Sequence, residues 1–252
     1  MIRVRDITIG EGSPKICAPV VEVTQEDILE EGEKLALSKG VDLIEWRIDF
    51  YDESSDISKI LQTASLLRTV VGKKPLLATF RTKNEGGNKE IEESAYKDML
   101  IAISESGDID MVDIEVYFMD EKNTKDIVKS LKKNVVVVGS YHDFDKTPDK
   151  EDIVGRLRKM QDLGADIPKI AVMPQSTEDL LALLSATEEM RRCYADRPVI
   201  TMSMAGTGVL SRMCGEVFGS ALTFGAAGKV SAPGQIDVEE LRTVLGIIHK
   251  SL

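Results

Sequence analysis

The chain has 252 residues, of which 42% are hydrophobic, and its formal net charge is −11 at pH 7. This length and apolar content fit one large soluble domain, whereas the acidic charge disfavours nucleic acid and anionic membranes as partners. Within the sequence, no apolar run reaches the roughly 20 residues that a membrane-spanning helix needs.

The amino terminus and the cysteines indicate the compartment. The first residues carry early charges and lack the apolar stretch of a secretory signal, so we expect a cytoplasmic protein. The cysteines, Cys17, Cys193 and Cys214, are odd in number and widely spaced, and no two form a CxxC pair. This pattern predicts buried thiols in a reducing compartment rather than disulfides or a zinc site.

Strand-like and helix-like stretches alternate along the chain. The strand candidates are short runs rich in Val, Ile and Leu: 15–20, 41–48, 75–81, 110–116, 134–142, 167–173, 198–204 and 221–226. The amphipathic helix candidates follow them in turn: 25–38, 57–71, 88–104, 124–132, 150–163, 177–194, 208–217 and 237–249. Such alternation predicts right-handed βαβ units and a parallel sheet, and units without linkers favour a closed (β/α)8 TIM barrel over an open sheet.

Residues 2–9 precede the first barrel strand and alternate between apolar and polar side chains. They end in Gly10-Glu-Gly, which is typical of a turn. We therefore expect an N-terminal β-hairpin that closes the bottom of the barrel. Because no linker or low-complexity tract interrupts the pattern, residues 1–252 are predicted to form a single catalytic domain.

Charged side chains fall where strand alternation predicts the barrel interior. Ile44, Trp46 and Ile48 share one face of the second strand. The apolar face belongs to the helix layer, so Glu45 and Arg47 are expected to point inward. The same alternation sends polar residues inward on the next four strands: Thr79, Arg81, Asp113, Glu115, Ser140, His142 and Lys169. Ionised groups are costly inside a barrel unless they are paired, so this cluster indicates a functional site.

Lys169 and His142 are the predicted reactive groups. Lys169 lies in an apolar stretch, and a buried lysine that loses its proton can attack a ketone and form an imine. The alternative, a lysine held only in an ion pair with Glu45 or Glu115, stays open. His142 ends the fifth strand, where an imidazole can act as a general acid and base. The polar residues show no metal-ligand spacing, so we expect no metal.

The anion site separates two kinds of barrel lyase. Arg212 offers a guanidinium fork for a carboxylate. Gly206-Thr-Gly and Gly225-Ala-Ala-Gly follow strands seven and eight, where many barrels bind phosphate, but glycines are also common in turns. A class I aldolase would need that phosphate cradle. A non-catalytic sensor of the same metabolite would be expected to lack Lys169 or His142.

Several strings resemble type I 3-dehydroquinate dehydratases in order and spacing along essentially the whole chain. They include Glu45-Trp-Arg-Ile-Asp, Ser140-Tyr-His-Asp-Phe, Pro168-Lys-Ile-Ala and Ser231-Ala-Pro-Gly-Gln. The resemblance is to the single-domain form. It implies a lyase of the shikimate pathway for aromatic amino acid biosynthesis, which dehydrates 3-dehydroquinate to 3-dehydroshikimate. It also implies that no cofactor is needed and that the enzyme is a homodimer.

The resemblance assigns roles to individual residues. Lys169 forms a Schiff base with the substrate ketone, His142 acts as general acid and base, and Glu85 is the carboxylate partner of that histidine. The other implied contacts are with the ring hydroxyls (Glu45, Arg47, Arg81), the substrate carboxylate (Arg212, Ser231, Gln235) and the apolar walls (Met202, Met204, Phe144, Phe224). The loop 226–235 is implied to be a lid. The part played by the first strand, which carries Ala18-Pro-Val, is left open.

Overall fold

The computed structural model describes residues 1–229 and 231–252. Among them, eight parallel strands form the barrel wall: β3 (Lys15–Val20), β4 (Leu43–Arg47), β5 (Leu76–Thr79), β6 (Met111–Glu115), β7 (Val136–Asp143), β8 (Ile167–Val172), β9 (Ile200–Ser203) and β10 (Leu222–Ala226). Each strand pairs with the next from β3 to β9, and β10 pairs with β3. A bridge between Val199 and Ser220 joins the remaining two edges. The (β/α)8 barrel predicted from the sequence is confirmed.

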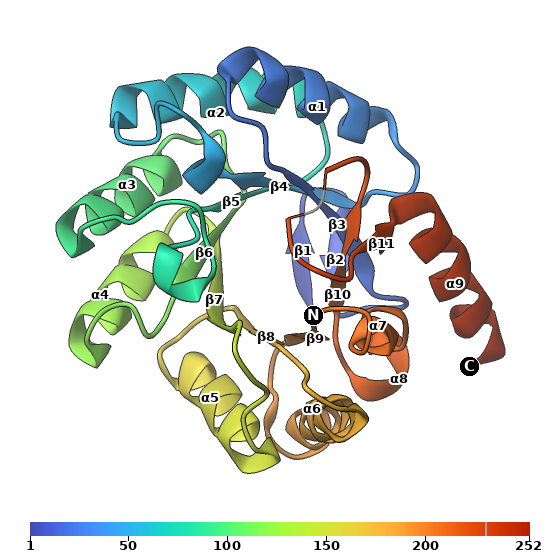
Figure 1. Cartoon of the computed structure of the whole chain (residues 1–252). Helices are drawn as coiled ribbons and strands as arrows, with labels where there is room; N and C mark the ends of the chain where they lie inside the picture. The colour runs from blue at the N-terminus through green and yellow to red at the C-terminus, as the bar shows by residue number, and fades with distance from the viewer. Residues whose placement is uncertain (230) are drawn as a thin grey trace.

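A ring of helices surrounds the strands (Figure 1). The helices are α1 (Gln25–Leu37), α2 (Ile57–Val71), α3 (Glu93–Glu105), α4 (Glu121–Leu131), α5 (Lys150–Asp162), α6 (Thr177–Glu189), α7 (Val209–Met213), α8 (Gly215–Phe218) and α9 (Val238–Ser251). Side-chain caps define several starts: Asp56 accepts from the Ser58 and Lys59 amides at α2, and Ser176 and Asp179 form a capping box at α6. In the described ranges, no helix is long and apolar enough to cross a membrane.

The predicted elements differ from the observed ones mainly at their ends. The predicted helix 88–104 begins only at Glu93, and the predicted helix 208–217 is split into α7 and α8. The last residues predicted for α6 form a π-helical turn, Met190–Tyr194. A short strand, β11 (Ile236–Asp237), pairs with β10 just before α9. At these places, the local backbone geometry determines which hydrogen bonds form and therefore where each element ends. The hydrophobic period does not fix these ends.

The amino-terminal hairpin closes the bottom of the barrel, as the sequence predicted (Figure 1). Its antiparallel strands are β1 (Ile2–Val4) and β2 (Ile7–Ile9). Val4 and Ile9 are buried against inward-facing side chains that include Leu43, Leu77 and Met111. The lower half of the barrel interior is therefore an apolar core, whereas the polar residues lie nearer the carboxyl ends of the strands.

The cysteines only partly follow the expectation of buried thiols. Cys17 is buried in the lower barrel core, but Cys214 is half-buried and Cys193 is exposed. Cys193 lies in the π-helical turn and Cys214 lies between α7 and α8. The sequence-based expectation was wrong for Cys193 because this turn at the end of α6 presents that side chain to solvent.

Replacing Ile9 by Ala should lower the free energy of unfolding by about 2–5 kcal/mol, the usual cost of truncating a buried isoleucine. Ile9 is fully buried in the hairpin, whereas Ile7 in the same strand is only partly buried. Ile7→Ala is the matched control and should cost less. Urea unfolding measures both values, and equal losses would contradict the closure of the barrel by Ile9.

Candidate active site

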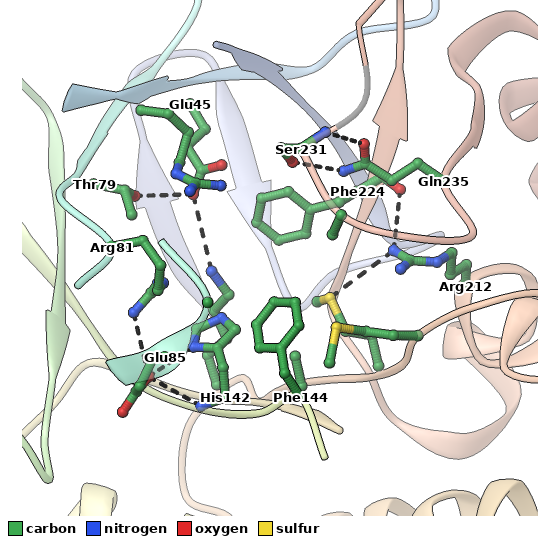
Figure 2. Close-up of a pocket in the computed structure, with 17 residues that line it drawn as sticks. Glu45, Thr79, Arg81, Glu85, His142, Phe144, Arg212, Phe224, Ser231 and Gln235 are labelled. Atoms are coloured by element: carbon green, nitrogen blue, oxygen red, sulfur yellow. Dashed lines mark hydrogen bonds and ion pairs between the residues drawn. The ribbon is translucent and has the colours of Figure 1, made fainter. Parts of the chain in front are cut away.

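A cavity with about 470 Å³ of empty space opens at the carboxyl ends of the barrel strands. Every residue to which the family resemblance assigns a role lines it, together with Thr79, Gly86, Ala171 and Ala232. Figure 2 shows Arg81, Glu85 and His142 on one side and Arg212, Ser231 and Gln235 on the other. No residue of β3 is among those that line the described part of this cavity, so the first strand contributes only indirectly.

Lys169 projects from the middle of β8 and is only 3% exposed. Its Nζ lies 3.0 Å from Asp113 Oδ2 and 3.9 Å from Glu45 Oε1. Nζ also lies 4.6 Å from the centre of the Phe224 ring. The sequence had offered Glu45 or Glu115 as ion-pair partners. Glu115 is the wrong residue, because its carboxylate is taken by Arg81 and Thr82.

His142 and Glu85 form a close pair at the edge of the cavity. His142 Nδ1 lies 2.9 Å from Glu85 Oε2, and the same oxygen accepts from the His142 amide at 3.0 Å. Glu85 ends a short 3-10 turn, and Gly86 follows it with a positive φ of 80°. A Cβ on Gly86 would lie 2.3 Å from Phe144 Cε2, so this turn requires glycine. Glu85 is thereby held against the imidazole that it was predicted to orient.

The surroundings of this pair favour a neutral imidazole. Burial lowers the pKa of His142 well below its ordinary value, and the nearby cations Arg81 and Lys169 lower it further. Burial and the neighbouring Glu115 carboxylate raise the pKa of Glu85. When Nδ1 is the donor to Glu85, Nε2 carries the free lone pair. At neutral pH such an imidazole is ready to accept a proton.

Arg81 is the centre of a buried ion-pair network. Its guanidinium donates to Asp113 Oδ1 at 2.8 Å, to Glu115 Oε1 at 2.9 Å and to Ser140 Oγ at 3.0 Å. Burial would lower the pKa of Arg81, but the carboxylates of Asp113, Glu115 and Glu85 raise it well above its ordinary value. The guanidinium therefore neutralises acids that would otherwise be unpaired inside the barrel.

Arg47 and Glu45 are fixed in similar ways. Arg47 donates to both carboxylate oxygens of Asp49 at 2.8 Å, and its guanidinium lies 5.0 Å from the centre of the Phe50 ring. Glu45 accepts from Thr79 Oγ1 at 2.9 Å. The sequence alone assigns no role to Asp49, Asp113, Thr79 or Ser140. Strand alternation had nevertheless placed all but Asp49 on the inward face.

Arg212 differs from the other buried cations. It is 1% exposed, and within the described ranges it forms no salt bridge with a carboxylate. Nη2 donates to the Pro233 carbonyl at 3.0 Å, and Nε has no hydrogen-bond partner. Burial lowers the pKa of Arg212 to about 10, so the side chain remains cationic at neutral pH. An anionic group in the cavity would complete this site.

Ser231 and Gln235, which follow β10, line the cavity on the Arg212 side (Figure 2). Gln235 Oε1 accepts from the Ser231 amide and Gln235 Nε2 donates to Ser231 Oγ, both at 2.9 Å. The Pro233 carbonyl accepts from the Ala205 amide at 3.1 Å as well as from Arg212. The predicted lid, 226–235, includes Val230, which lies outside the described residues. The glycines considered as a phosphate cradle, Gly206 and Gly225, do not line the described cavity.

A family model described as type I 3-dehydroquinase matches residues 16–252. The chain belongs to this family. The 3-dehydroquinate dehydratase of Clostridioides difficile (strain 630) is 51% identical over 251 residues, which cover 100% of this chain and 98% of that protein. The 3-dehydroquinate dehydratase of Bacillus subtilis (strain 168) is 50% identical over 252 residues, with 100% and 98% covered. Membership of the type I 3-dehydroquinase family confirms the resemblance seen in the sequence and makes the protein an enzyme.

Solved structures of the family have the same fold. A type I 3-dehydroquinate dehydratase from Clostridium difficile, crystallised with covalent modified comenic acid, gives a TM-score of 0.96 at 51% identity and covers 100% of this chain and 98% of that one. The 3-dehydroquinate dehydratase from Geobacillus kaustophilus gives 0.95 at 42% identity, with 99% and 96% covered. The barrel of this chain is thus the barrel of the type I family.

The His142 imidazole should stay neutral as the pH falls below 6.5, the ordinary histidine value, because its pKa is lowered by burial and by neighbouring cations. The sequence has only two histidines, so the variants His142→Ala and His249→Gln assign both ring resonances. Proton NMR between pH 4 and 8 measures the titration. A His142 midpoint at or above 6.5 would contradict the structure.

Proposed function

We propose that this enzyme dehydrates 3-dehydroquinate to 3-dehydroshikimate through an imine on Lys169. The observation that carries the proposal is a buried primary amine in the same cavity as the His142–Glu85 pair. The covalent modified comenic acid of the Clostridium difficile relative supports a nucleophile in this family. A phosphate-binding aldolase is disfavoured, because the described part of the cavity offers Arg212, an arginine without a carboxylate, rather than a glycine cradle.

The imine explains why the reaction needs both residues. The Lys169 ammonium group gives up one proton, attacks the substrate ketone as an amine and takes one proton back, so that water is released and the nitrogen is left as a positively charged iminium. This charge acidifies the proton on the adjacent carbon. His142 removes that proton, and the electron pair then expels the hydroxyl group from the next carbon. His142 gives its proton to the departing oxygen, so the imidazole returns to the neutral state. Water finally hydrolyses the imine and frees Lys169.

The rest of the cavity positions the substrate. Arg212 pairs with the substrate carboxylate, and Ser231 and Gln235 assist from the loop that acts as a lid. Glu45, Arg47 and Arg81 bind the ring hydroxyls with the donors and acceptors that the buried network leaves available. The apolar walls are Met202, Met204, Phe144 and Phe224. A cytoplasmic homodimer remains the prediction for the whole protein.

Sodium borohydride added with 3-dehydroquinate should reduce the imine and leave the ligand covalently attached to Lys169. Peptide mass spectrometry measures the mass and position of the adduct. Lys169→Met is the control and should remain unmodified and inactive. An unmodified Lys169 in an enzyme that is turning over would contradict the imine mechanism.

Replacing His142 by Ala should lower kcat by about 10²–10⁴-fold, because the proton transfers lose their acid and base. The imine adduct should still form in this variant, since Lys169 and its partners are untouched. Steady-state kinetics and borohydride trapping of the same preparation measure the two steps separately. A near-normal kcat would remove His142 as the base.

A further inference from the structure

We propose that Asp113 is the positioning residue of Lys169: its carboxylate aims Nζ into the cavity and balances the positive charge on that nitrogen throughout imine formation. This inference rests on the proposed function, because it concerns the imine. Asp113 is fully buried and does not line the cavity, so it acts through Lys169 rather than on the substrate.

The two oxygens of the Asp113 carboxylate have different partners. Oδ1 accepts from Arg81 Nη2 at 2.8 Å and from Ser140 Oγ at 2.6 Å. Oδ2 accepts from Lys169 Nζ at 3.0 Å. Two donors on Oδ1 fix the plane of the carboxylate, so that Oδ2 is held at one place beneath the lysine. A long, flexible side chain is thereby restricted to one orientation.

The strand register explains why Asp113 contacts Lys169 from the side of the amino ends of the strands. Glu115, Ser140 and Lys169 are cross-strand neighbours on β6, β7 and β8. Asp113 lies two residues before Glu115 on the same inward face, nearer the amino end of β6. From there its carboxylate contacts the inner side of the ammonium group and leaves the outer side open to the cavity.

Asp113 is also the closest negative charge to the lysine. Glu45 Oε1 is 3.9 Å from Nζ and accepts from Thr79, whereas Asp113 is at 3.0 Å. The pKa of Asp113 is about 2, because the cations Arg81 and Lys169 and the Ser140 hydroxyl outweigh the effect of burial. The other titratable or charged groups on the elements around the lysine are Cys17 on β3, Arg81 just after β5, Glu115 on β6 and His142 on β7.

The charge balance of imine formation fits a fixed counter-ion. An ammonium group and a ketone give an iminium and one water: two nitrogen-bound protons leave with the ketone oxygen, and the third stays on nitrogen. The new C=N double bond uses the two electron pairs that those two N–H bonds release, while both C=O electron pairs remain on the departing oxygen. Nitrogen is positive before and after the reaction, so an ionised carboxylate at this position stabilises both states. It also favours the charged iminium over the uncharged imine, which is a poorer electron sink.

The test compares Asp113→Asn with Glu115→Gln in the full-length enzyme. Both acids are fully buried and both bind Arg81, but only Asp113 contacts Lys169. Asp113→Asn should slow the formation of the borohydride-trapped adduct and lower kcat on the order of 100-fold, the loss that a misplacement of about 1 Å causes. KM should change little, because Asp113 does not line the cavity.

Glu115→Gln should lose folding stability, measured by thermal unfolding, without a comparable loss of adduct formation or of kcat. If Asp113→Asn does not fold, Ser140→Ala takes its place, because it removes one of the two donors on Oδ1 and keeps the charge. It should slow adduct formation in the same direction by a smaller factor. The wild-type adduct is the reference: its absence would contradict the imine itself.

Three results would overturn the inference while the wild-type adduct is still observed. The first is adduct formation at the wild-type rate in Asp113→Asn, or in Ser140→Ala if only that variant folds. The second is faster adduct formation in Asp113→Asn, which would mean that Asp113 only holds the lysine in an unreactive state. The third is an equal loss of adduct formation and of kcat in Glu115→Gln.

Discussion

Pairing of buried charge in the upper half of the barrel is the constraint on which the rest of this structure depends. Lys169, Arg81 and Arg47 are almost completely buried, and leaving any of them there without a carboxylate would cost stability. Asp113, Glu115 and Asp49 supply these partners from β6 and from the turn after β4. The site is therefore built around an ion-pair network, and this network determines the positions of the reactive groups.

The stability of the fold comes from elsewhere in the molecule. Apolar side chains fill the layer between strands and helices, and a second apolar cluster closes the lower barrel around the hairpin. This separation lets the carboxyl ends of the strands carry polar residues that a purely structural barrel would replace by branched aliphatic ones. His142 and Arg212 differ from the buried cations that are paired with carboxylates. The first is kept neutral by burial and neighbouring cations, and the second is left as a cation without a carboxylate.

Strand alternation was sufficient to find most of the site but not its pairings. It placed Asp113 and Glu115 on the inward face, yet it could not say which of them meets Lys169. That choice depends on the stagger between β6 and β8 and on Arg81, which binds both acids. Alternation also gave no signal for Asp49, because this residue lies past the end of β4 in a 3-10 turn. Ser140 was placed inward, but its hydrogen bond to Asp113 becomes visible only when β6 and β7 are aligned.

The sequence by itself determined the barrel, the amino-terminal hairpin, the family and most of the residues that line the cavity. It could do so because hydrophobic period, strand spacing and residue strings are properties of the chain read in order. The tertiary structure alone decided which carboxylate serves which cation, how Glu85 reaches His142, and that Arg212 meets a backbone carbonyl instead of an acid. These contacts join residues on different strands and loops, and their distances depend on register and burial, which no local pattern encodes.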